Sequence, residues 1–373
     1  MKWQRSIKNI RMDKPRILLF SPSFQGRHKW DYESHYVTGS GGSESNHIEL
    51  AQTLAALGHE VISFAPIPDD KHGTEHKGVK WYKDQGADST LEGVWIIYRT
   101  LVPLDFITKT DKQKICIYLH DVTLEDPWTE ERIEKIDKVF VQCARHKWLM
   151  GEIQPRLKDK LEIVTPGADF TRYEIIEKEL GIIERNPKSL IWASSPIRGL
   201  QYLVDIFLRA KEHVSDLSLD IFYGFDYFDD RIPEHNKVKN KILKYSKYPG
   251  INYRGKVGKS RLIKEWLSHG LWVYPTMFLE TFCQCAIEAQ AFGAIPIINP
   301  LWGVAENVKF GNQIQGNAYD DPLVQARFVE AIVAFARDPQ LQDDIRKQMM
   351  PQIREAYSWS SLGPEWSRLL CSI

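Results

Sequence analysis

Short apolar runs alternate with amphipathic stretches along most of the chain. Residues 15–22 hold an apolar run between two prolines, which is typical of a strand buried on both faces of a parallel sheet. The glycine-rich residues 38–45 lead into apolar positions at helical spacing over 48–57, and a second apolar run covers 61–65. This strand, loop, helix and strand order predicts the building block of a doubly wound sheet.

The same alternation continues and then starts again in the second half of the chain. Further strands are predicted over residues 93–98, 114–119, 138–142, 189–194, 217–224, 251–254, 271–274 and 294–298, with a helix over 200–214. The charged residues 177–188 separate the two series and predict a linker. The fold class is therefore α/β, with two Rossmann-like, doubly wound domains that face a central cleft.

A length of 373 residues suits two domains better than one, because domains usually hold about 100–200 residues. The predicted division is a basic N-terminal arm (1–14), an N-terminal domain (15–180), a C-terminal domain (181–355) and a final helix (356–373). That helix is rich in aromatic residues, has Ser360 or Ser361 as a cap, and is expected to pack back across the domains.

The composition excludes several classes of protein. Lys plus Arg equals Asp plus Glu at 49 each, so no overall charge attracts the protein to nucleic acid. The five scattered cysteines lack the spacing of a zinc site with histidines, and we interpret them as reduced thiols in a cytoplasmic protein. The Cys283 and Cys285 pair is expected to pack in a helix rather than bind a metal.

Membrane contact, if any, is expected at the N-terminus. No apolar run reaches the roughly 18–20 residues that cross a bilayer, and the first residues lack the apolar core of a signal peptide. Residues 1–16 combine six basic side chains with Trp3, which suits peripheral contact with an anionic membrane surface. A solvated terminal tail is the alternative, and the sequence leaves both open.

Residues 275–296 carry the most informative chemistry. They follow an apolar strand and place Glu280 in a loop and Glu288 eight positions later, in a helix expected to open at Thr281 and Phe282. A loop carboxylate can accept hydrogen bonds from sugar hydroxyls, and a helical one can bind the hydroxyls of a ribose. The N–H groups at the helix start suit a diphosphate.

This segment resembles the Glu-x7-Glu motif of the retaining glycosyltransferases of family 4 (glycosyltransferases group 1). The family's continuation of the motif is matched by Ala289, Gly293, Pro296, Gly303 and Glu306. The resemblance implies the GT-B fold, a nucleoside-diphosphate sugar bound by the C-terminal domain, and an acceptor hydroxyl held by the N-terminal domain. It also implies transfer of a hexose with retention, by front-face attack and without a metal.

Further residues are assigned through the same resemblance. The loop at Gly41 and Gly42 resembles the family's glycine loop, and Arg198 fits a lysine position that neutralises the diphosphate. The arginine expected five residues upstream is Ala193, for which Arg254 or Lys256 could compensate. The implied donor-binding residues are Gly41, Gly42, Ser195, Arg198, Lys256, Val257, Glu280, Thr281, Phe282 and Glu288. The implied catalytic residues are His120, Glu280 and Arg198, and no metal ligand is implied.

His120 also stands out by its position, because it follows an apolar strand, and ligands of such sheets bind at the carboxyl ends of strands. A glycan or glycolipid acceptor and a UDP-sugar, slightly favoured over a GDP-sugar, are the expected substrates, with no cofactor. Two rival hypotheses remain. One is an epimerase-like enzyme that acts on the nucleotide sugar itself, and the other is a degenerate transferase that only binds a glycan or a protein partner.

Overall fold

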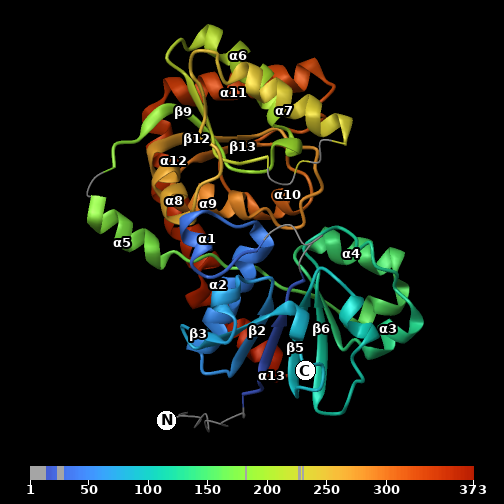
Figure 1. Cartoon of the computed structure of the whole chain (residues 1–373). Coiled ribbons are helices and arrows are strands. Elements are labelled where there is room, and N and C mark those ends of the chain that lie inside the picture. Colours follow the sequence, from blue (N-terminus) through green and yellow to red (C-terminus); the bar gives the residue numbers. More distant parts are fainter. Residues whose placement is uncertain (1–13, 23–28, 181–182, 226–227, 229–230) are drawn as a thin grey trace, which may run out of the picture.

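The strands of the N-terminal half form one eight-stranded sheet (Figure 1). The computed structural model describes residues 14–22, 29–180, 183–225, 228 and 231–373, so residues 1–13 of the predicted basic arm lie outside it. In spatial order the strands are β3 (Thr74–His76), β4 (Val79–Lys83), β2 (Val61–Ala65), β1 (Ile17–Phe20), β5 (Gly93–Tyr98), β6 (Gln113–Tyr118), β7 (Lys138–Val141) and β8 (Leu161–Ile163). All neighbours are parallel except the β3–β4 hairpin.

The C-terminal half forms a second sheet of six parallel strands. Their spatial order is β11 (Ile251–Tyr253), β10 (Ser218–Ile221), β9 (Asn186–Trp192), β12 (His269–Tyr274), β13 (Ile295–Ile298) and β14 (Asn312–Gln313). Its central strands are apolar on both faces, and every residue of β12 and β13 is buried. Two doubly wound parallel sheets confirm the predicted fold class.

Helices cover both sheets. The first half contains α1 (Ser34–Val37), α2 (Gly42–Ala56), α3 (Glu130–Lys135), α4 (Ala144–Ile153) and α5 (Thr171–Leu180), with 3-10 turns at Asp69–Lys71, Asp84–Gly86, Val102–Asp105 and Pro155–Lys160. The second half contains the 3-10 turn Pro196–Arg198, then α6 (Leu200–His213), α7 (Pro233–Tyr245), α8 (Lys259–Ser268), α9 (Gln284–Phe292), α10 (Gly303–Asn307), α11 (Pro322–Arg337), α12 (Pro339–Tyr357) and α13 (Trp359–Cys371).

The final helix α13 belongs spatially to the first half of the chain. It packs against α2, and its Leu362, Trp366 and Leu370 are buried in the same apolar cluster as Ile48 and Leu54 of α2. Figure 1 shows α13 in red against the blue and teal strands of the first sheet. The chain therefore ends on the domain with which it began, and α12 and α13 bridge the two sheets.

Several local predictions differ from the structure. Helix α5 extends to Leu180 and β9 begins at Asn186, so most of the predicted linker 177–188 is regular structure, because Ile176 is buried and α5 packs on α8. The β3–β4 hairpin lies in a segment without a predicted strand. Ser358, rather than Ser360 or Ser361, caps α13 by accepting from the N–H of Ser361.

Candidate active site between the two sheets

A cavity of about 380 Å³ lies between the two halves of the molecule. Its walls include the glycine loop before α2, the end of β6, the turn before α6 and the loop that leads into α9. The predicted site residues that line it are Gly41, Gly42, His120, Ser195, Arg198, Val257, Glu280, Thr281, Phe282 and Glu288. Lys256 is the predicted donor-binding residue that does not line it. Tertiary structure thus brings together segments that lie far apart in the sequence.

The glycine loop closes onto the opposite domain. A Cβ on Gly39 would lie 2.5 Å from the carbonyl oxygen of Val257, and one on Gly258 would lie 2.3 Å from the carbonyl oxygen of Tyr36. Gly39 also has a φ of +89°, which favours glycine. The two halves are therefore in backbone contact beside the cavity, and this edge of the cleft is closed.

The N-terminus of α2 faces the cavity through Gly41, its N-cap residue. The carboxylate of Glu44 folds back over this helix end, since a Cβ on Gly41 would lie 2.2 Å from its Oε2. A carboxylate is stabilised there by the partial positive charge of the helix terminus. Beside it, Gly42 has open space where a Cβ would lie, which leaves room for a ligand.

Glu280 and Arg198 form an ion pair at the cavity. Arg198 Nη1 donates to both carboxylate oxygens of Glu280, at 2.7 and 3.0 Å, and its guanidinium lies over the ring of Phe278, 4.5 Å from the centroid. The Tyr274 hydroxyl donates to Glu280 at 2.6 Å. Burial opposes the charge on Arg198, but the carboxylate of Glu280 raises the guanidinium pKa overall. Arg198 is therefore a permanent cation held in one orientation.

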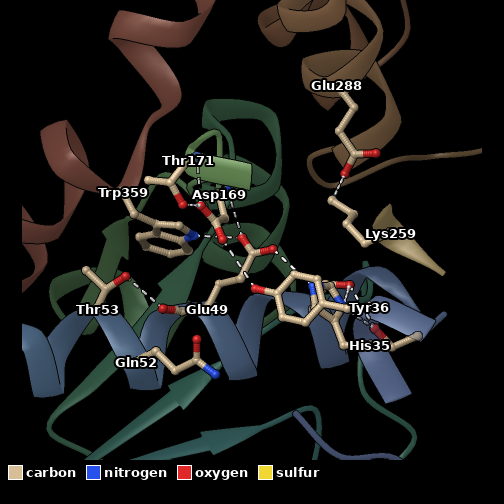
Figure 2. A network of polar contacts seen from close by, with 12 residues as sticks. His35, Tyr36, Glu49, Gln52, Thr53, Asp169, Thr171, Lys259, Glu288 and Trp359 are labelled. Atoms are coloured by element: carbon tan, nitrogen blue, oxygen red, sulfur yellow. Dashed lines mark hydrogen bonds and ion pairs between the residues drawn. The ribbon is translucent and has the colours of Figure 1, made fainter. Parts of the chain in front are cut away.

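Glu288 is paired with a lysine that the sequence did not point out. Lys259, the first residue of α8, donates to Glu288 Oε1 (Figure 2). The indole of Trp266 donates to Glu288 Oε2 at 3.2 Å. Both side chains of the ion pair are buried. The helix that carries Glu288 begins at Gln284 instead of at Thr281 and Phe282, because Cys283 has a left-handed φ of 69°. The predicted helix start was therefore three residues too early.

His120 lies where the two domains meet. The Thr281 hydroxyl, on the Glu280 loop, lies 2.8 Å from the His120 carbonyl oxygen and 3.0 Å from Gln142 Oε1, and the Gln142 amide lies 3.0 Å from His120 Nδ1. Burial lowers the pKa of His120 well below its ordinary value, and the nearby charge of Arg99 lowers it further. The imidazole is therefore neutral at pH 7, and its buried Nε2 has no hydrogen-bond partner among the described residues.

Glu306, which the sequence resemblance assigned to the continuation of the motif, makes a second contact across the cleft. Its carboxylate oxygens accept from the backbone N–H groups of Ala144 and Arg145 at 3.0 and 3.2 Å. It thus caps the N-terminus of α4, in the other half of the chain, where negative charge is stabilised. The sequence placed Glu306 in the motif but gave no signal for this partner.

A larger cavity of about 920 Å³ adjoins the first one in the N-terminal half. The two share Arg99 and Asp121, whose side chains pair at 2.6 Å. Four carboxylates line the larger cavity, those of Asp84, Asp121, Glu125 and Asp126, whereas Arg99 is the one basic side chain among its described lining residues. Phe106 also lines it and is 72% exposed, which makes it an accessible aromatic surface.

Among the described residues, no three His, Cys, Asp or Glu side chains are grouped so that they could hold a metal ion. The five cysteines are free thiols, and burial raises the pKa values of Cys283 and Cys285. In the part of the chain that the structure describes, no helix combines the length and apolar character needed to span a bilayer.

Two parallel-sheet domains with a cavity between them define the GT-B fold. A sucrose-phosphate synthase from Thermosynechococcus elongatus shares it at a TM-score of 0.70 and 16% identity, over 95% of this chain and 98% of that one. HepE from Anabaena, solved with UDP and glucose, shares the fold at a TM-score of 0.68 and 14% identity, over 96% of this chain and 100% of that one. A glycosyltransferase from Rickettsia africae shares the fold at a TM-score of 0.69 and 16% identity, over 96% of this chain and 98% of that one.

The sequence comparisons gave no such match. No family model matches the sequence, and no curated protein matches it. The similarity to known proteins therefore lies in the structure, and it confirms the predicted GT-B fold.

Proposed function

We propose that this protein is a glycosyltransferase that moves a hexose from a UDP-sugar to a hydroxyl group of a glycan or glycolipid. The observation that carries the proposal is the cavity between the sheets, where Arg198, Glu280 and His120 meet the N-termini of α2 and α9. Helix N-termini and a fixed guanidinium suit a diphosphate leaving group. HepE, which shares the fold, was solved with UDP, with UDP-glucose, and with UDP and glucose.

In this proposal the transfer retains configuration and requires no metal. Arg198 stabilises the charge that develops on the diphosphate as the glycosidic bond breaks. Neutral His120 faces the transferred sugar as a hydrogen-bonding group, and Glu280 orients both Arg198 and the sugar hydroxyls. The contacts of Thr281 and Glu306 across the cleft hold these groups in register and exclude water.

We place the acceptor in the larger cavity of the N-terminal half. It adjoins the donor cavity at Arg99 and Asp121, so an acceptor hydroxyl bound there can point toward the donor sugar. The excess of carboxylates in its lining repels an anionic acceptor. A neutral sugar ring, stacked on Phe106 and hydrogen-bonded to the carboxylates, is the acceptor that fits this lining.

Calorimetric titration with UDP, GDP, ADP and their sugars, with and without a chelator, tests the donor site. Chelator-insensitive binding of one nucleotide with a Kd below about 100 μM, an ordinary enzyme–substrate affinity, is expected. Failure of every nucleotide to bind would favour the degenerate, partner-binding alternative. Nucleotide release that needs no added acceptor, accompanied by a change in the sugar itself, would favour the epimerase-like alternative.

A further inference from the structure

Two cations of the C-terminal half line the donor cavity within the described residues, Arg198 and Lys259. Arg198 stands at the turn before α6 and is paired with Glu280. Lys259 stands at the start of α8 and is paired with Glu288. The two carboxylates of the Glu-x7-Glu pattern thus each hold one cation beside the cavity.

Both cations line the same cavity as Ala193, the position where an arginine was expected. The thiol of Cys285 donates to the Ala193 carbonyl oxygen at 3.1 Å, which places these two residues in contact. Burial raises the pKa of Cys285, and the charges of Lys259 and Arg198 oppose that rise. Ala193, Cys285 and Lys259 all line the cavity, so the region that an arginine at 193 would neutralise already has a second cation.

The substitutes suggested by the sequence are placed differently. Arg254 Nε donates to Asp220 Oδ1 at 2.7 Å, and Arg254 does not line the cavity. Lys256, which follows two positions later, is also absent from the lining, whereas Lys259 is part of it. The start of α8, not the segment before it, therefore supplies the cation.

Lys259 is held charged although it is only 8% exposed. Burial alone would lower its pKa, but the carboxylates of Glu288 and Glu49 raise the pKa above the ordinary lysine value. An ammonium group has three N–H donors, and Glu288 accepts from it (Figure 2). The remaining donors can bind a phosphate oxygen without breaking the ion pair.

We propose that Lys259 is a diphosphate-binding residue of the donor site that replaces the arginine missing at Ala193, with Glu288 and Trp266 fixing its ammonium group. This inference rests on the proposed function, since it assumes a nucleoside-diphosphate donor in the cavity.

The test compares UDP with uridine, which lacks the diphosphate, by calorimetry. In Lys259→Met we expect UDP affinity to fall about 10- to 100-fold, as for loss of a hydrogen bond to a charged group, with uridine affinity unchanged within about twofold. Lys259→Arg should keep most of the UDP affinity. Arg261→Met is the matched control, because Arg261 lies on the same helix, is exposed and pairs with Glu265.

Three outcomes would overturn the inference about Lys259, and a fourth would overturn the proposed function instead. Equal UDP affinity in Lys259→Met and the parent protein, an equal loss for UDP and uridine, or a similar loss in Arg261→Met would each reject a diphosphate contact. If Lys259→Met does not fold, Lys259→Gln replaces it, since its amide still donates to Glu288. If the parent protein binds no nucleoside diphosphate, the proposed function fails, which the parent titration shows before any variant is made.

Discussion

The indole Nε1 of Trp359 donates a hydrogen bond of 2.8 Å to the carboxylate of Glu49, which lies 310 positions earlier in the chain (Figure 2). Glu49 is buried on α2, and the same carboxylate accepts from the backbone N–H of Asp169 and lies 3.3 Å from His35 Nε2. Trp359 also covers Gly167, where a Cβ would lie 2.5 Å from the indole ring. One buried carboxylate thus joins the final helix, the crossover between the domains and the segment before the glycine loop.

Trp359→Phe should destabilise the protein, because the carboxylate of Glu49 loses a hydrogen-bond donor. The change keeps an aromatic ring but removes one donor from a buried, charged acceptor, which costs about 1–3 kcal/mol of unfolding free energy. Urea denaturation followed by circular dichroism measures it. Trp148→Phe is the control, because Trp148 is 57% exposed. Equal stability of the Trp359→Phe variant and the parent protein would show that the hydrogen bond contributes nothing.

Gly258→Ala should hinder closure of the cleft without straining its own backbone. Gly258 has a φ of −72°, which alanine adopts readily, but the added Cβ would meet the backbone of Tyr36 and Val37 at 2.3–2.4 Å. A displacement of about 1 Å at the cleft can lower turnover about 100-fold. We expect transfer from a UDP-sugar to fall by that order, and small-angle scattering to report a larger radius of gyration.

Gly151→Ala is the control for closure, because the atoms nearest to a Cβ there belong to the side chains of Lys158 and Leu161 and lie 3.4 Å or more away. Unchanged turnover in Gly258→Ala would mean that the contact between α1 and α8 has no part in catalysis.

The two glutamates of the motif should have separable effects. Glu280→Ala removes the acceptor that orients Arg198, so we expect turnover to fall about 100-fold or more, with UDP affinity largely kept. Glu288→Ala should mainly weaken UDP binding, because it removes the partner of Lys259 and the carboxylate that we expect to bind the ribose. Steady-state kinetics and calorimetry distinguish the two. Unchanged binding and turnover in both variants would refute the site.

Stability should fall between neutral and acidic pH because of buried histidines. Burial lowers the pKa of His47 from 6.5 to about 3 and that of His146 to about 4. Below pH 6.5 the unfolded chain binds protons that the folded chain does not. The unfolding free energy therefore decreases as pH falls from 7 toward 4, by up to about 1.4 kcal/mol per pH unit for each histidine.

Urea denaturation at pH 7, 6 and 5 measures this dependence, and His47→Gln should reduce it. The Nε2 of His47 lies 2.7 Å from the Ser63 hydroxyl, a contact that a glutamine amide can partly replace. His213→Gln, at an exposed position, should leave the dependence as it is. The assignment would be wrong if the parent protein and His47→Gln lost stability in parallel.

Phe106→Ala should weaken binding of the acceptor substrate and leave binding of the donor substrate unchanged. Loss of the exposed ring from the larger cavity is expected to raise the acceptor KM roughly fivefold or more, equivalent to about 1 kcal/mol, while UDP affinity stays constant. Ile163→Ala, at another exposed apolar position of the same half, is the control. An unchanged acceptor KM would place the acceptor outside this cavity.

The apolar pattern of the sequence was sufficient to predict most of the parallel strands. Residues 61–65 and 93–98 were predicted as strands with the bounds that β2 and β5 have in the structure. Strands buried on both faces are short apolar runs, which a sequence displays directly. Strand β3 was missed, because its residues Thr74–His76 are polar and only partly buried or exposed. Strand β4, which has buried Val79 and Trp81 at alternating positions, and the short strands β8 and β14 were not predicted either.

The sequence by itself determined the α/β fold with two parallel sheets, because buried strands and glycine turns are local features. Its resemblance to a known family then named several of the residues that line the cavity, although it included Lys256 and left out Lys259. Only the tertiary structure decided which side chains are paired there. Lys259 is 29 positions from Glu288, and Glu306 is 162 positions from Ala144, so neither pair has a sequence signal. Ion pairs between distant segments depend on the packing of helices and domains, and that packing is specified by the whole chain at once.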